Sequence, residues 1–157
     1  MVEFKKQLVL DWAKEVLQNT ALSFTSQLKT ICEKLRTELT HYDWVGFYFA
    51  NHKTQTLHLK AFAGAPTNHT VIPFGKGICG QVALKNAPLN IPDVQTVDNY
   101  IACSVEVKSE LVVPIFVKDV NVGQIDIDSN TPNAFSLEDE QFLIQLCQEI
   151  APHYISI

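Results

Sequence analysis

Apolar residues recur at helical spacing near both ends of the chain. This spacing predicts two helices over residues 4–18 and 21–39, and the segment SLEDEQFLIQLCQEIAPHYI predicts a long final helix. Ser136 is expected to cap the start of that helix, with Asp139 at the capping-box position, where Glu or Gln is the more usual residue. Helices therefore enclose a central region with a different pattern.

The central region is patterned as β-strands. Residues 42–50 are rich in aromatic side chains, and residues 55–64 alternate apolar and polar positions, so the two predict a hairpin whose second strand has one face in water. Residues 110–117 and 120–128 predict a second hairpin around a Lys-Asp turn. We expect this second hairpin at the centre of a sheet.

The segments between these strands carry turn-forming residues. Glycine, proline and asparagine predict a loop over residues 64–77, a short helix is expected between Gly77 and Pro88, and residues 89–108 are expected to be irregular. Helices at both ends with antiparallel strands between them predict an α+β fold, in which helices pack against one sheet.

Composition and charge narrow the class of protein. With 157 residues, of which 46% are apolar and 18% charged, the chain fits a single self-folding domain. A net charge of -5 and scattered basic residues argue against nucleic acid as a partner. The charged N-terminus does not resemble a signal peptide, and no run approaches the roughly 18 apolar residues of a membrane span. We therefore expect a cytoplasmic protein with no membrane partner.

Four cysteines carry the first candidate chemistry. They are expected to remain thiols, and because they form no CxxC pair and their spacings match no zinc module, neither a metal nor a cofactor is expected. Cys32 and Cys147 lie among apolar helix positions and are expected in the core. Cys79 either gains acidity from a helix dipole or serves as a small residue in a glycine turn. Cys103 is either a buried, inert thiol or a nucleophile.

Three carboxylates are the second candidate. Asp126 and Asp128 lie two apart on a predicted strand, so both project from one face, either as a solvent-facing polar edge or as a pair in which repulsion raises one pKa. In a hairpin that turns near residues 118–120, Glu110 falls roughly opposite the end of the second strand, around Asp128. The three acids are therefore expected to converge, and a loop folding back over the sheet would bring the sulfur of Cys103 to them.

Two aromatic residues are the third candidate. Trp44 and Tyr48 lie four residues apart on the first predicted strand, and they therefore share a face. They serve either as core packing or as an aromatic wall for a small cationic or sulfur-bearing ligand. Their spacing is compatible with both roles.

The order of short motifs carries a family resemblance. The stretches YDWVGFYF, IPFGKGICGQVA, IPDVQTVDNYIACS, SELVVPIF, VGQIDIDS and FSLEDEQFLIQLC follow one another over residues 42–147. In this order they resemble the single-domain GAF proteins that act as free methionine-(R)-sulfoxide reductases. The resemblance implies one GAF domain over residues 1–157, with N-terminal helices within 1–40. Residues 42–157 would form a six-stranded antiparallel sheet with helices packed on its faces, a pocket and the C-terminal helix.

The resemblance also implies an activity, the reduction of free L-methionine-(R)-sulfoxide through a cysteine sulfenic acid that a thioredoxin-type reductant recycles. The site residues that it implies are Cys103 of IAC as nucleophile, Glu110 of SE with Asp126 and Asp128 of DIDS for the substrate ammonium or for protonation of the sulfoxide oxygen, Trp44 against the methyl-sulfur end with Tyr48 nearby, and Cys79 of GKGICG as a resolving thiol. No metal or cofactor belongs to this implied site.

Two positions depart from the family pattern. His69 stands where a further cysteine is usual, and Ser104 follows Cys103 where aspartate is common. Resolution of the sulfenic acid would then use Cys79 or an outside thiol. Two other functions stay open: a non-catalytic GAF module that binds a small molecule in the same pocket, and a structural dimerisation domain. A homodimer is expected from the family resemblance alone.

Overall fold

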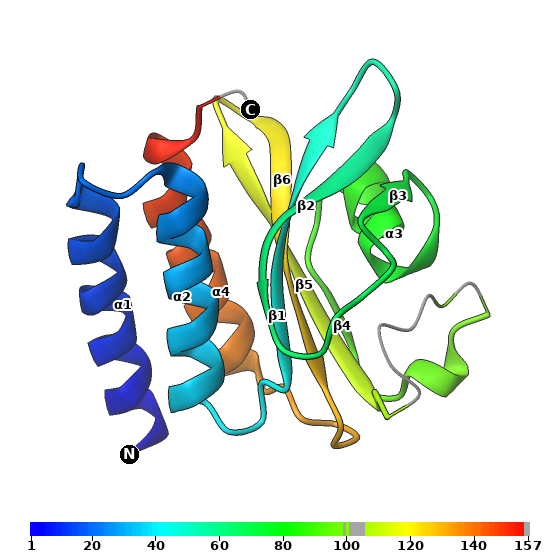
Figure 1. Ribbon diagram of the computed structural model, residues 1–157. Helices are drawn as coiled ribbons and strands as arrows, with labels where there is room; N and C mark the ends of the chain where they lie inside the picture. Colours follow the sequence, from blue (N-terminus) through cyan, green and yellow to red (C-terminus); the bar gives the residue numbers. More distant parts are fainter. Residues whose placement is uncertain (99, 101–105, 156–157) are drawn as a thin grey trace.

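The computed structural model describes residues 1–98, 100 and 106–155 (Figure 1). The helices in this part are α1 (Val2–Gln18), α2 (Phe24–Glu38), α3 (Gly77–Lys85) and α4 (Leu137–Ile150). The strands are β1 (Trp44–Asn51), β2 (Thr56–Ala63), β3 (Val71–Pro73), β4 (Leu89–Ile91), β5 (Ser109–Val117) and β6 (Val120–Ser129). Single 3-10 turns lie at Val94–Thr96 and Ala151–His153. No helix in the described ranges has the length and apolar character needed to span a membrane.

The six strands form one antiparallel sheet in the order β3-β2-β1-β6-β5-β4. The predicted second hairpin, β5 with β6, lies inside the sheet as expected. Helices α1, α2 and α4 form a layer on one side, and α3 lies against the other face, as Figure 1 shows. The predicted α+β fold, a six-stranded antiparallel sheet with helices packed on its faces, is therefore confirmed.

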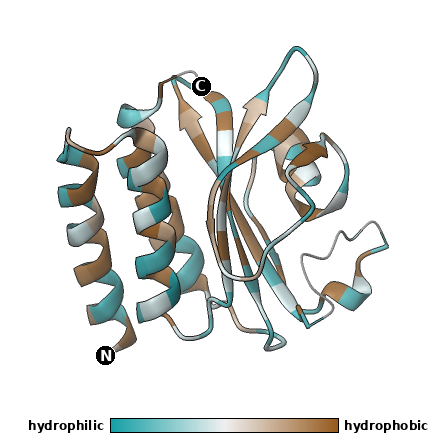
Figure 2. Ribbon diagram, viewed as in Figure 1, coloured by the Kyte–Doolittle hydropathy of each residue, from teal (hydrophilic) through white to brown (hydrophobic). Residues whose placement is uncertain are grey.

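Each face of the sheet has its own apolar core, because successive side chains of a strand point to opposite faces. On β1, Val45 and Phe47 pack in the larger core with α1, α2 and α4, whereas Trp44 and Tyr48 pack in a smaller core with α3. Figure 2 shows hydrophobic residues along the central strands and a mixture of both kinds on the helices, as amphipathic helices require. The smaller core contains the candidate aromatic residues.

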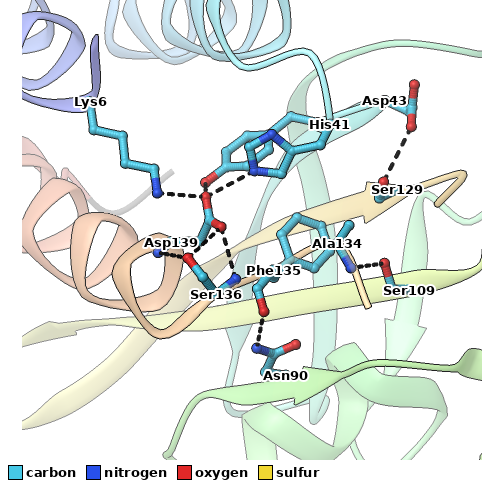
Figure 3. Close-up of polar contacts among 11 residues, drawn as sticks. Lys6, His41, Asp43, Asn90, Ser109, Ser129, Ala134, Phe135, Ser136 and Asp139 are labelled. Carbon is cyan, nitrogen blue, oxygen red and sulfur yellow. Dashed lines mark hydrogen bonds and ion pairs between the residues drawn. The ribbon is translucent and has the colours of Figure 1, made fainter. Parts of the chain in front are cut away.

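A buried polar network joins α1 to the start of α4 (Figure 3). One carboxylate oxygen of Asp139 lies 3.0 Å from Nζ of Lys6 and 3.0 Å from Nε2 of His41, and it accepts a hydrogen bond of 2.8 Å from the hydroxyl of Tyr42. The other oxygen accepts hydrogen bonds from the backbone and side chain of Ser136. The predicted capping box is therefore confirmed, and its acid also binds α1.

Two short strands lie in segments that the sequence pattern predicts to be irregular. The three residues of β3 pair with β2, and the three residues of β4 pair with β5. A strand this short cannot display an alternation of apolar and polar positions, so only its partner strand defines it. These two strands complete the six that the family resemblance implies.

A β-bulge interrupts the alternation of apolar and polar positions that the sequence predicts for β2. The register with β1 shifts between Phe47, which pairs with Ala61, and Tyr48, which pairs with Leu59, so Lys60 is the extra residue. Leu57 consequently packs with α3, whereas Ala61 packs in the opposite core. The prediction of one apolar face along the whole strand is therefore wrong.

Candidate functional site

Three carboxylates converge on the face of the sheet that α3 covers. Glu110 on β5 pairs directly with Asp128 on β6, and Asp126 lies on the same face of β6. The exposed fractions of Glu110, Asp126 and Asp128 are 4%, 2% and 1%. The pairing predicted from the hairpin turn is confirmed, and the alternative of a solvent-facing polar edge is excluded.

Helix α3 adds a thiol to these acids, forming what we call the acid-thiol cluster: Cys79, Glu110, Asp126 and Asp128. Sγ of Cys79 lies 3.9 Å from Oε1 of Glu110. Ligand atoms of Cys79, Glu110 and Asp126 all lie within 4.8 Å of one another. Gly80 allows the turn between β3 and α3 to pack against the helix, because a Cβ at that position would lie 2.7 Å from the carbonyl oxygen of Pro73.

Burial raises the pKa values of Glu110, Asp126 and Cys79. Burial, followed by the charges of Asp126 and Asp128, raises the pKa of Glu110 well above its usual value. Burial also raises the pKa of Asp126 to about 6, although hydrogen bonds with Glu110 and Cys79 oppose this rise. Burial and then the nearby carboxylates raise the pKa of Cys79, so a gain of acidity from the helix dipole does not occur. Their surroundings therefore favour the protonated form of Glu110 and the neutral thiol of Cys79.

Trp44 and Tyr48 form an aromatic wall on the same face. Their ring centroids lie 6.4 Å apart, and the Trp44 indole stacks on Phe62 with a centroid distance of 5.8 Å. Nε1 of Trp44 donates a hydrogen bond to the carbonyl of Ala65, and the Tyr48 hydroxyl donates one to the carbonyl of His69. The predicted shared face is confirmed, and the two rings also anchor the segment between β2 and β3.

Two residues on this face were not predicted as part of the site. Gln124 is fully buried, and its side-chain amide donates a hydrogen bond of 3.2 Å to the carbonyl of Cys79. Gly46 lies under the indole of Trp44, where a Cβ would collide with the ring. The alternation that joins Asp126 to Asp128 also places Gln124 on their face, so this signal was present in the sequence.

A small pocket lies between α3 and the sheet. Its walls are formed by Tyr48, His69, Ile72, Lys76, Gly77, Ile78, Cys79, Glu110 and Asp126. The pocket therefore combines an aromatic ring, two carboxyl groups and a thiol. Cys103, the predicted nucleophile, lies outside the described residues.

The arrangement of sheet and helices is that of a GAF domain, and the family model for the GAF domain matches residues 23–153. A free methionine-R-sulfoxide reductase of Escherichia coli is 38% identical to this chain over 128 residues, which cover 82% of this chain and 76% of that protein. A free methionine-R-sulfoxide reductase of Saccharomyces cerevisiae is 39% identical to this chain over 110 residues, which cover 69% of this chain and 61% of the yeast protein.

Solved structures show the same relationship. The type II free methionine-R-sulfoxide reductase from Thermoplasma acidophilum aligns with a TM-score of 0.79 and 40% identity, over 83% of this chain and 91% of that one. The free methionine-R-sulfoxide reductase from Neisseria meningitidis, in complex with its substrate, aligns with a TM-score of 0.88 and 30% identity, over 94% and 87% of the two chains. This chain belongs to the GAF-domain family of free methionine-R-sulfoxide reductases.

Proposed function

We propose that this chain reduces free L-methionine-(R)-sulfoxide to methionine, with thiols as the source of electrons. The observation that carries the proposal is the acid-thiol cluster, in which a buried carboxyl group with a raised pKa lies in a pocket with an aromatic wall. Protonation makes a sulfoxide oxygen easier to remove, and carboxylates bind the ammonium group of a free amino acid. The reductase descriptions of the relatives support the same substrate.

Cys103 is the proposed nucleophile. Its thiolate attacks the sulfur of the sulfoxide while Glu110, whose pKa is raised, gives a proton to the oxygen. The attack joins the two sulfur atoms; the protonated oxygen then moves from the substrate sulfur to the sulfur of Cys103 as the sulfur-oxygen bond of the substrate and the bond between the two sulfur atoms break, so methionine leaves and Cys103 becomes a sulfenic acid. The thiolate supplies two electrons, and the reaction consumes one proton.

Asp126 and Asp128 are proposed to bind the ammonium group or to assist the proton transfer. Trp44 pairs with Asp128 across β1 and β6, so an aromatic ring and a carboxylate come from adjacent positions of the sheet. This suits a ligand with a positive charge at one end and a methyl-sulfur group at the other, with Trp44 against that group and Tyr48 nearby.

Cys79 is the proposed resolving thiol. It condenses with the sulfenic acid to form a disulfide and water, and a thioredoxin-type dithiol then reduces the disulfide. Because the pKa of Cys79 is raised, its proton must be removed during this step, and Asp126, with a pKa of about 6, is the proposed acceptor. In the alternative route, an outside thiol attacks the sulfenic acid directly.

A second candidate function is a non-catalytic GAF module that binds a small molecule in the same pocket. His69, which stands where the family usually has a further cysteine, favours this function because it removes one thiol from the redox chemistry. The two candidates differ in one observable, which is whether bound sulfoxide is turned over.

The test is consumption of free L-methionine-(R)-sulfoxide by the reduced, full-length protein with dithiothreitol. Cys103→Ser should abolish turnover, whereas Cys79→Ser should retain it, because dithiothreitol replaces the resolving thiol. Cys147→Ser is the matched control, since Cys147 is a buried thiol in the opposite core. With thioredoxin as the reductant, Cys79→Ser should lose turnover as well. Folded, reduced wild-type protein without turnover would contradict the reductase and leave the binding module.

A further inference from the structure

The acid-thiol cluster also has the composition of a metal site, although the proposed reaction requires no metal. Sγ of Cys79 and carboxylate oxygens of Glu110 and Asp126 lie within 4.8 Å of one another, and all three side chains are buried. The three residues come from α3, β5 and β6, so no local spacing motif in the sequence predicts that they lie together. Sulfur and carboxylate oxygen together form a donor set that zinc accepts.

Two unpaired acceptors also point to a ligand at this place. Oδ1 of Asp126 and Oε1 of Gln124 are buried and have no hydrogen-bond partner among the residues that the structure describes. Buried polar atoms normally have partners, because burial without one is unfavourable. Asp126 lines the pocket, and the amide of Gln124 is bonded to the backbone of Cys79. Both unpaired acceptors therefore belong to side chains at the acid-thiol cluster.

The distance between the thiol sulfur and a carboxylate oxygen suits a tetrahedral zinc ion. Zinc bonds sulfur at about 2.3 Å and carboxylate oxygen at about 2.1 Å, so the two ligand atoms lie about 3.6 Å apart. The distance from Sγ of Cys79 to Oε1 of Glu110 is 3.9 Å. Mg²⁺ and Ca²⁺ take six or more oxygen ligands and do not favour sulfur. We propose that Cys79, Glu110 and Asp126 bind Zn²⁺ or another thiophilic divalent cation, with a fourth coordination position open to water.

Binding exchanges protons for the cation. Cys79 and Glu110 must each release a proton to become ligands, and the cation then offsets the negative charge of one thiolate and two carboxylates. The affinity for Zn²⁺ is therefore expected to rise with pH. The same three ligand groups cannot hold Zn²⁺ and a substrate ammonium group at once.

Bound zinc would inhibit the reductase, because Glu110 as a zinc ligand has no proton to give. This consequence rests on the proposed function, whereas the binding itself does not. Binding and turnover are therefore measured separately, so that failure of one is distinguishable from failure of the other.

The experiment uses the reduced, full-length protein. Co²⁺ serves as a spectroscopic probe, because a thiolate ligand produces a charge-transfer band, and Zn²⁺ affinity is measured by competition with a chromophoric chelator. Wild type should bind one equivalent, and Cys79→Ser should lose the band. Asp126→Asn should weaken Zn²⁺ binding at least as much as loss of an outer-shell partner does, about 10- to 100-fold. Cys147→Ser should bind as wild type does.

Cys103→Ser decides whether the band comes from the proposed ligand. Retention of binding in Cys103→Ser together with its loss in Cys79→Ser supports the proposal, whereas loss in both variants contradicts a fourth position open to water. The proposal is overturned if wild type binds no stoichiometric metal, or if Cys79→Ser binds Zn²⁺ as tightly as wild type does. Circular dichroism verifies that each variant is folded.

Discussion

Replacement of Asp126 with asparagine is expected to stabilise the folded protein at neutral pH while impairing the proposed reduction. Asp126 is 2% exposed, and its Oδ1 has no hydrogen-bond partner in the described ranges. Burial raises its pKa from 3.8 to about 6. At about 1.4 kcal/mol for each pKa unit, the folded state disfavours the charged form by about 3 kcal/mol. Asparagine keeps the shape of the side chain and removes this charge.

The same pKa difference determines how the effect depends on pH. Because the folded state binds the proton of Asp126 more tightly than the unfolded state does, the free energy of unfolding falls as pH rises from about 4 to about 6, and then levels off. Asp126→Asn removes this contribution to the slope. The variant should therefore exceed wild type by less than about 1 kcal/mol at pH 4 and by about 1 to 3 kcal/mol at pH 7.

Urea unfolding at several pH values measures this difference, and a turnover assay measures the accompanying loss of activity. Asp119→Asn is the matched control, because Asp119 lies in the exposed turn of the same hairpin at a positive φ that asparagine also adopts. The control should show no gain that grows with pH. A loss of stability at pH 7, or an equal gain at pH 4 and pH 7, would refute the reasoning that Asp126 is a buried acid without adequate compensation.

Two further substitutions test the two faces of the sheet. Asp139→Ala leaves Lys6 buried without its carboxylate, so it should lower the free energy of unfolding, measured by urea titration, by about 3–5 kcal/mol. The control is Glu138→Ala, an exposed change in the same helical turn, which should lower it much less. Burial opposes ionisation of Asp139, but its hydrogen-bond donors hold its pKa well below the usual value, so the deficit of Asp139→Ala should shrink below about pH 4. Gly46→Ala should displace the indole of Trp44 and lower the free energy of unfolding by about 1–3 kcal/mol, because the added methyl group overpacks the core. It should also raise KM for free methionine-R-sulfoxide more than it lowers kcat. An unchanged KM would contradict the proposed substrate contact of Trp44.

The convergence of the acids could be predicted because it depends on one hairpin. The turn at Lys118 pairs Val117 with Val120, and a register shift between Ile115 and Phe116 then places Glu110 opposite Asp128. The period-two alternation of a strand adds Asp126 to the same face. The turn alone therefore predicts the approach of the acids to within one residue, and the shift that completes the register depends on the pairing of the two strands.

The approach of Cys79 and the burial of the acids could not be predicted in this way. Cys79 is 31 residues before Glu110, and α3 brings it there only by packing across the sheet. Alternation shows which residues share a face but not whether a helix covers that face, so a solvent-facing edge remained open. The bulge at Lys60 likewise depends on pairing with β1, and nothing in the alternation of β2 itself indicates it.

Two buried aspartates, Asp139 and Asp126, show how the surroundings of a carboxylate determine whether it has a structural or a chemical role. Asp139 is 3% exposed, but Lys6, His41 and other donors surround it, so its charged form is favoured and it joins two helices. Asp126 is as deeply buried, and here burial outweighs the hydrogen bonds with Glu110 and Cys79, so its charged form is disfavoured. A residue with only a structural role gains nothing from this arrangement, because an apolar or amide side chain of the same size would cost less. The cost is offset when a ligand brings a positive charge or accepts a proton, and the acid-thiol cluster is therefore where an ammonium group, a sulfoxide oxygen or a zinc ion is expected to bind.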